Sequence, residues 1–204
     1  MTLFRNLILA LTALTLASCG GGSKAVVDGD MAMGAPEGAK VTVVEYASPT
    51  CPHCALWQQN TWPAFKAAYV DTNKVRYVFR ELPTPPAEVA AAGFLLARCA
   101  GPDKYFDVLH AIMESQTEWR TGTNPRDSLI RIAGGVGIDE AAFTRCVTNP
   151  EAIAALETRV KAATDAGVIN TPTFFVNGKQ VSSPGGEGTV MADLGPAIEA
   201  ELAK

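Results

Sequence analysis

Four consecutive residues, Cys51-Pro52-His53-Cys54, place two thiols three positions apart. They directly follow the apolar run 41–48 and open a segment with helical character, so we expect Cys51 at the N-terminus of a helix. Backbone N–H groups lack partners there, and the helix dipole favours an anion. The thiolate is the attacking species in thiol–disulfide exchange. The motif therefore predicts a redox-active cysteine pair whose first thiol has a lowered pKa.

The size of that pKa shift indicates what else the site needs. A helix dipole contributes about 0.3–2 kcal/mol, and one pKa unit corresponds to about 1.4 kcal/mol, so the dipole alone accounts for roughly one unit. A larger shift requires N–H hydrogen bonds to the sulfur and a polar neighbour, for which His53 is the candidate. A stabilised thiolate favours the dithiol, which makes the disulfide a stronger oxidant. An acidic Cys51 thus favours donation of disulfides over their reduction.

Two other roles for a C-x-x-C motif stay open at this point. Half of a zinc site would need a second C-x-x-C or a His cluster, and the sequence contains neither. A structural disulfide is the second alternative, although the junction of a strand and a helix is a reactive position. We therefore expect no bound metal.

The segments around the motif predict two strands separated by a helix. The β-branched run 41–48 and the alternating segment 74–82 are typical of strands. Residues 52–70 between them are typical of a helix, which Pro63 would kink.

The second half of the chain predicts a block of helices followed by a hairpin. Residues 86–167 show only helical patterns. Two short strands at 173–176 and 179–181 are joined by Asn177-Gly178, a strong hairpin signal, and a last helix follows at about 189–203. Inside the block, three residues are typical of helix N-caps: Asn124, Asp139 and Asn149.

The composition excludes several classes of protein. Hydrophobic residues make up 48% of the 204 positions and charged residues 19%, which is typical of a folded domain. The formal charge of −4 argues against a nucleic-acid binder, which would carry a basic face. Five cysteines are too few for a disulfide-stapled miniprotein, and their odd number leaves at least one without an intramolecular partner.

The N-terminal residues predict export. Residues 1–18 carry Arg5 and then an apolar run of about ten residues, shorter than the roughly 20 of a membrane span, as in a signal peptide. Leu16-Ala-Ser-Cys19 resembles the lipobox of bacterial lipoproteins, which implies cleavage before Cys19 and a lipid on its thiol; an ordinary signal peptide is the alternative. Residues 19–40 lack periodic hydrophobicity and are interpreted as a flexible tether. Disulfides persist outside the cytosol.

Two separated segments resemble one protein family. Glu45-Tyr-Ala-Ser-Pro-Thr-Cys51-Pro-His-Cys54 and the downstream Thr171-Pro-Thr-Phe-Phe-Val-Asn-Gly178 are similar to the DsbA family of periplasmic thiol–disulfide oxidoreductases. The likeness covers about residues 28–203 and, with the lipobox, indicates a lipoprotein member. It implies an α/β, thioredoxin-like fold with an inserted all-helical subdomain. The thioredoxin-like domain would comprise residues 41–85 and 168–204, and the helical insertion residues 86–167.

The resemblance implies roles for single residues. Cys51 would be the exposed nucleophile that forms the mixed disulfide, and Cys54 the buried thiol that resolves it. Glu45 would lie under the site, with a pKa raised by desolvation, and would exchange a proton with Cys54; a solvent-facing Glu45 is the alternative. Pro172 would be a cis proline facing the motif, and the chain at Thr171 would offer backbone groups to an extended substrate. Thr171 itself departs from oxidases, which have an apolar residue there, and is similar to isomerase-type members.

The same assignments leave Cys99 and Cys146 as the natural pair for a structural disulfide. Cys19 would be lipidated, and Cys51 and Cys54 would be used in exchange. Two reduced, buried thiols in the helical insertion are the alternative.

The resemblance also implies a function. The Cys51–Cys54 disulfide would be donated to reduced or unfolded exported proteins and regenerated by a membrane oxidase similar to DsbB, with no cofactor besides the disulfide. The protein would be a monomer at the periplasmic face of a bacterial membrane, anchored through the lipid on Cys19; the soluble periplasm is the alternative location.

Two competing functions differ in chemistry. A disulfide isomerase or reductase would use the same thiols, but residues 20–40 are too few for the dimerisation domain that isomerases of this type usually carry. A lipid-anchored copper-binding module would belong to a different class. Such modules tend to use C-x-x-x-C with a distal histidine, whereas this chain has C-x-x-C and only His110, which we interpret as a structural residue.

Overall fold

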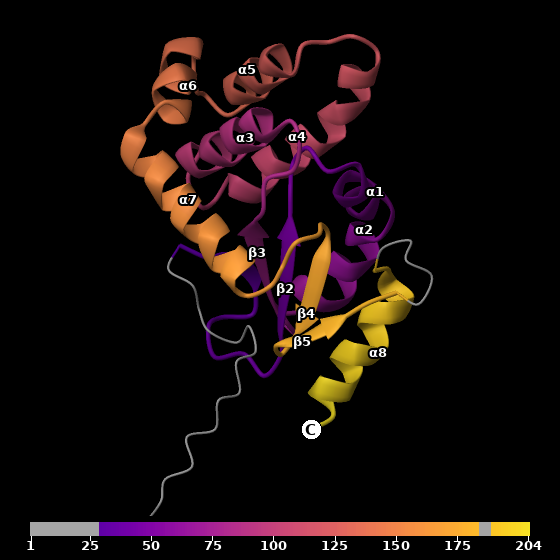
Figure 1. Cartoon of the computed structure of the whole chain (residues 1–204). Helices are drawn as coiled ribbons and strands as arrows, with labels where there is room; N and C mark the ends of the chain where they lie inside the picture. The colour runs from indigo at the N-terminus through magenta and orange to yellow at the C-terminus, as the bar shows by residue number, and fades with distance from the viewer. Residues whose placement is uncertain (1–28, 184–188) are drawn as a thin grey trace, which may run out of the picture.

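The structure, a computed structural model, describes residues 29–183 and 189–204. The predicted signal peptide and Cys19 lie outside the described residues. Within them, a mixed sheet has the strand order β1-β3-β2-β4-β5 (Figure 1). The strands are β1 (Met31–Gly34), β2 (Thr42–Ala47), β3 (Arg76–Glu81), β4 (Thr173–Val176) and β5 (Lys179–Val181).

The central strands are buried on both faces of the sheet. Strands β2 and β3 pair in parallel, and β4 pairs antiparallel with β2 on the other side. One face carries Val43, Tyr77 and Phe79 into the main core, which also contains side chains of α1 (Pro52–Asn60) and α8 (Met191–Leu202). The opposite face packs Val44 and Val78 against α7 (Pro150–Asp165). Both faces of the sheet therefore exclude water.

The predicted helix over 52–70 is divided into three pieces. Helix α1 ends at Asn60, α2 covers Trp62–Phe65, and a π-helical turn, η1, covers Lys66–Val70. The interruption falls at Thr61, two residues before Pro63, as the missing N–H of a proline predicts.

Five helices form the insertion predicted between residues 86 and 167; in Figure 1 the first four lie beyond one end of the sheet, and the last, α7, runs back alongside it. The predicted caps at Asn124, Asp139 and Asn149 are confirmed, because each side chain accepts a backbone N–H of its helix. The hairpin at Asn177-Gly178 is confirmed as well. In order, the helices are α3 (Ala87–Cys99), α4 (Tyr105–Arg120), α5 (Pro125–Gly135), α6 (Glu140–Val147) and α7.

The expected flexible tether is wrong for its last part. Met31–Gly34 forms β1, which pairs antiparallel with the edge of β3. Asp30 accepts two hydrogen bonds from Arg80, at 3.0 and 2.9 Å. Gly34 ends the strand with φ 80°, where a Cβ would come within 2.5 Å of the Val75 carbonyl oxygen. A four-residue strand is too short to show alternation in the sequence, and the open edge of β3 supplies its pairing.

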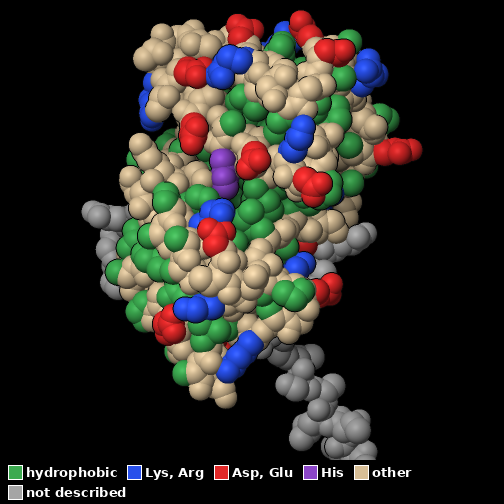
Figure 2. Space-filling view, turned by 180° about the vertical axis from the view of Figure 1, so that it is seen from behind, with side chains coloured by type: hydrophobic (Ala, Val, Ile, Leu, Met, Phe, Trp, Pro, Cys, Tyr) green, Lys and Arg blue, Asp and Glu red, His purple; other side chains and the backbone are tan. Residues whose placement is uncertain are grey.

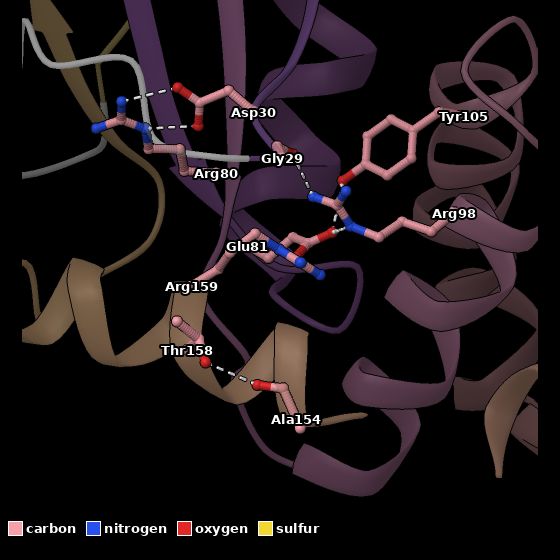
Figure 3. Close-up of polar contacts among 9 residues, drawn as sticks. All are labelled: Gly29, Asp30, Arg80, Glu81, Arg98, Tyr105, Ala154, Thr158 and Arg159. Atoms are coloured by element: carbon pink, nitrogen blue, oxygen red, sulfur yellow. Dashed lines mark hydrogen bonds and ion pairs between the residues drawn. The ribbon is translucent and has the colours of Figure 1, made fainter. Parts of the chain in front are cut away.

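A buried ion-pair cluster joins the sheet to the helical insertion (Figure 3). The side chain of Glu81, at the end of β3, has no exposed surface and accepts hydrogen bonds from Arg98 Nε at 2.6 Å and Arg159 Nε at 2.7 Å. Tyr105 donates its hydroxyl to the same carboxylate at 3.2 Å. Arg98 also donates to the Gly29 carbonyl, so the cluster ties the start of the described chain to α3 and α7.

The face of the molecule seen in Figure 2 does not carry charges of a single sign. Figure 2 shows acidic and basic side chains interspersed among hydrophobic ones over the rear face of the molecule. Among the described residues, no helix combines the length and the apolar character that a membrane span requires.

We expect Glu81→Gln to lower the free energy of unfolding by about 3 kcal/mol, the lower end of the range for a buried pair, because it leaves two partly buried guanidinium groups without a counter-charge. Glu140→Gln removes an ion pair whose two side chains are 55% and 60% exposed, and should cost below about 1 kcal/mol. Urea denaturation of both variants measures the difference. Equal losses would contradict a structural role for the cluster.

The structure joins Cys99 of α3 to Cys146 of α6 across 47 positions. For a loop of this length, replacing both residues with alanine should lower the free energy of unfolding by about 4 kcal/mol. Non-reducing peptide mapping should recover one linked peptide pair. Cys99 lies at the surface, so a free thiol there would react readily. Alkylation of Cys99 in the native protein would therefore contradict the bridge.

Candidate active site

The two motif cysteines lie where β2 gives way to α1. Cys51 is the N-cap of this helix, and Pro52 occupies its first turn, where a missing N–H costs nothing. The Cys51 Sγ accepts the backbone N–H of Cys54 at 3.4 Å. A sulfur thus takes the place of the side-chain oxygen that usually caps a helix.

Several donors converge on the sulfur of Cys51 and lower its pKa to about 6. The hydrogen bond from the Cys54 thiol lowers this pKa most, whereas burial of Cys51 raises it. Smaller contributions come from the Thr171 side chain and from the backbone N–H groups of Cys54 and His53. His53 therefore acts through its backbone, whereas the sequence had indicated its side chain.

Access to the two thiols differs from the expectation. Cys54 is fully buried as predicted, but only 4% of Cys51 is exposed, so the expected exposed nucleophile is wrong in this structure. The cause is the loop before β4, whose Thr171 carbonyl oxygen lies 3.4 Å from the Cys51 sulfur. Cys51 remains the more accessible of the pair.

The environment changes the pKa values of the two thiols in opposite directions. The pKa of Cys54 is raised well above its usual value, first by burial and then by its hydrogen bond to Cys51. At neutral pH the pair therefore holds one thiolate, on Cys51, and one proton, on Cys54. Separate protonation states of this kind assign separate chemical roles.

Glu45 lies in β2 with 2% of its surface exposed, which rules out the solvent-facing alternative. The pKa of Glu45 is raised to about 8, mainly by burial. The Tyr77 hydroxyl donates to Glu45 Oε2 and lowers this pKa, whereas the charge of Cys51 raises it further. The carboxylate charge also contributes to the raised pKa of Cys54. Glu45 is thus a carboxylic acid at neutral pH, placed close enough to the thiols to interact with both.

The Thr171–Pro172 bond is cis. It immediately precedes β4, which pairs antiparallel with β2, so the loop lies beside the strand end that leads into the motif. The structure therefore brings Thr171 into contact with Cys51. Contact of Thr171 and Pro172 with a substrate stays a prediction.

Two groups that position Cys51 were missed in the sequence. Ser48 Oγ accepts the backbone N–H groups of Thr50 and Thr84, which fixes the loop before the motif. Gln116 of α4 donates to the carbonyl oxygens of Pro49 at 2.8 Å and Cys51 at 3.2 Å. Gln116 lies four residues after Ile112, so it belongs to the apolar face of its helix. A polar residue on that face could have indicated a buried hydrogen-bonding role from the sequence alone.

No cluster of three or more metal-binding side chains occurs in the part of the chain that the structure describes. His110 lies between aromatic rings, 5.2 Å from the Trp62 ring centre and 6.2 Å from that of Phe106. Burial lowers its pKa to about 4, so it is neutral at physiological pH. These surroundings are those of a structural residue.

Comparisons with known proteins agree with this geometry. The protein RC0029 of Rickettsia conorii, provisionally named a protein-disulfide oxidoreductase, is 39% identical over 160 residues. That match covers 78% of this chain and 57% of the Rickettsia protein, so the chain spans little more than half of that relative.

Solved structures show the same fold. α-DsbA1 of Wolbachia pipientis superposes with a TM-score of 0.74 at 24% identity, covering 87% of this chain and 93% of that one. BdbD of Bacillus subtilis, in its oxidised form, gives 0.72 at 21% identity, with 90% and 98% covered. The family described as thioredoxin matches residues 26–192. The chain therefore belongs to the thioredoxin family and has the fold of the DsbA proteins, including their helical insertion.

Proposed function

We propose that this protein is a thiol–disulfide oxidoreductase that donates the Cys51–Cys54 disulfide to other proteins. The observation that carries the proposal is the opposite shift of the two thiols, with the pKa of Cys51 near 6 and that of Cys54 well above its usual value. A stable Cys51 thiolate makes the dithiol the favoured state, so the disulfide passes readily to a client.

The exchange proceeds in two displacements. A client thiolate attacks Cys51 Sγ of the oxidised pair, the Cys51–Cys54 bond breaks, and Cys54 leaves as a thiolate. A second client thiolate then attacks the client sulfur of the mixed disulfide, closing the client's disulfide and releasing Cys51 as a thiolate. The client loses two electrons and the cysteine pair gains them.

Glu45 supplies the proton that the first displacement requires. A thiolate on Cys54 is costly because that sulfur is fully buried. Glu45 is protonated at neutral pH, and its transfer of a proton to Cys54 removes the buried charge. In the reverse direction, when the pair is reoxidised, the carboxylate takes the proton back.

The direction of disulfide exchange separates the proposed oxidase from the second candidate, an isomerase or reductase. Isomerase or reductase activity would use the same pair, and Thr171 is similar to isomerase-type members. Here the Thr171 side chain helps to lower the pKa of Cys51, which favours the reduced pair and hence donation. Oxidation of reduced ribonuclease, compared with reduction of insulin, tests the direction; efficient insulin reduction without ribonuclease oxidation would replace the proposal with a reductase.

The cellular setting is part of the same proposal. The clients would be reduced or unfolded exported proteins, and a DsbB-like membrane oxidase would restore the disulfide. The predicted export signal and Cys19 support anchoring through a lipid at the periplasmic face of a bacterial membrane, where the protein would be a monomer. Incorporation of a labelled fatty acid, lost in Cys19→Ser, tests the anchor.

The alkylation rate of Cys51 should rise with pH through a midpoint near 6, because only the thiolate reacts. The pKa of Cys51 in the folded dithiol is lowered from 9.0 to about 6. The lowered pKa therefore stabilises the dithiol relative to the disulfide, and this stabilisation is complete only above pH 9. It is lost as the pH falls through 6. A Cys54→Ala variant is unsuitable for this measurement, because it lacks the Cys54 thiol, whose hydrogen bond lowers the pKa of Cys51 most. The rate is instead measured on the wild-type protein, by mass spectrometry of the Cys51 peptide. A midpoint near 9 would contradict the site.

We expect Glu45→Gln to slow oxidation of a client dithiol at neutral pH by roughly 100-fold, the lower end of the range for general acid–base catalysis. Tyr77→Phe removes the hydroxyl whose hydrogen bond lowers the pKa of Glu45, so that pKa should rise. The pH profile of the oxidation rate should therefore shift to higher pH. Stopped-flow tryptophan fluorescence measures both. Rates and pH profiles identical to wild type would remove Glu45 from the mechanism.

A further inference from the structure

A buried glycine of the helical insertion lies against the loop that leads into the motif. Gly93 is in the middle of α3, and the ring of Pro49, two residues before Cys51, packs against it. A Cβ at position 93 would come within 3.1 Å of Pro49 Cγ and 3.6 Å of Pro49 Cβ. Glycine inside a helix is less favourable than alanine. The close approach of Pro49 is a reason for a glycine at this position.

Pro49 has little freedom to move away from α3. Its carbonyl oxygen accepts a hydrogen bond from Gln116 Nε2 at 2.8 Å, and the same amide group donates to the Cys51 carbonyl oxygen at 3.2 Å. The pyrrolidine ring fixes φ of Pro49, so the ring and the backbone move together. Pro49 is therefore held between two helices of the insertion: α3 contacts its ring, and α4 holds its carbonyl oxygen.

The segment between β3 and α3 fixes the same loop from another side. Thr50 donates its hydroxyl to the Thr84 carbonyl oxygen at 2.8 Å. Ser48 Oγ accepts the backbone N–H groups of both threonines. Ser48 and Thr50 are buried, so water does not compete for these hydrogen bonds. Because the loop is held on both sides of Pro49, a displacement of Pro49 is passed on to Cys51.

We propose that Gly93 is a positioning residue for Cys51, because its missing side chain lets Pro49 lie against α3 and so places the Cys51 sulfur among its donors. The inference rests on the proposed disulfide exchange and names a residue of the insertion that adjusts it. The sulfur accepts the Cys54 backbone N–H at 3.4 Å, and donors from His53 and Thr171 reach it as well. Hydrogen bonds weaken with distance and misalignment. A shift of the loop therefore weakens the stabilisation of the thiolate.

Gly93→Ala tests the proposal through the pH dependence of Cys51 alkylation in the reduced, full-length protein. The alkylation midpoint should rise by roughly half a pH unit, which makes the reaction about threefold slower at a pH below the midpoint. Gly134→Ala is the matched control. Gly134 also lies in a helix, α5, but a Cβ there would meet nothing within 4 Å. The midpoint of this control should equal that of the wild type.

A second substitution identifies the contact responsible. Pro49→Ala removes the ring that the new Cβ would meet, so Gly93→Ala should shift the midpoint in the wild-type background but not in the Pro49→Ala background. Urea denaturation of each variant separates this effect from stability, because a purely structural role of Gly93 would change the free energy of unfolding and leave the midpoint in place. Gln116→Met removes the donors to the Pro49 and Cys51 carbonyl oxygens and should raise the midpoint as well.

A midpoint in Gly93→Ala equal to that of the wild type would overturn the proposal. An equal shift in Gly134→Ala, or the same shift with and without the Pro49 ring, would also overturn it, since the effect would not come from this contact. If Gly93→Ala does not fold, an unchanged midpoint in Gln116→Met overturns it instead. Failure of the wild-type protein to oxidise reduced ribonuclease would overturn the proposed function, whereas the alkylation midpoints would still decide the role of Gly93.

Discussion

The proposed chemistry depends on the stabilisation of one sulfur, Cys51 Sγ, as a thiolate at the junction of β2 and α1. Four donors from three residues lower its pKa: the Cys54 thiol, the backbone N–H groups of His53 and Cys54, and the Thr171 side chain. Thr171 is 120 residues from Cys51 in the chain. The antiparallel pairing of β4 with β2 brings it to the sulfur, so the sheet order is a requirement of the chemistry.

Burial of the sheet on both faces raises the pKa of Glu45 and so keeps its carboxyl group protonated at neutral pH. A carboxyl in a strand with one wet face would be ionised at neutral pH, whereas α1 and the helical insertion keep water from this one. The Tyr77 hydroxyl prevents a still larger shift, so that the pKa of Glu45, near 8, stays within reach of physiological pH. The insertion thus contributes more than a covering layer, because its α4 also holds the motif loop through Gln116.

Local signals in the sequence were sufficient for the elements and for the reactive pair. Asn124, Asp139 and Asn149 mark helix starts through their own side chains, and the C-x-x-C motif carries its chemistry within four residues. What was missed depends on distant partners. Strand β1 gains its order from the edge of β3 and from the contact of Asp30 with Arg80, and the low exposure of Cys51 comes from a loop 120 residues away. Gln116 and Tyr77 each look like ordinary members of an element until the fold aligns them with Cys51 and Glu45.

The most direct test is the reduction potential of the Cys51–Cys54 couple as a function of pH. A pKa lowered from 9.0 to about 6 stabilises the dithiol by about 1.4 kcal/mol at pH 7, which raises the potential by about 30 mV. Below pH 6 reduction takes up two protons, and the potential should fall by about 59 mV per pH unit; above pH 6 it takes up one, and the slope should halve to about 30 mV. Equilibration with glutathione buffers measures this. A break near pH 6 is the predicted result, and a slope of about 59 mV per unit continuing unbroken to pH 8 would contradict a stabilised Cys51 thiolate.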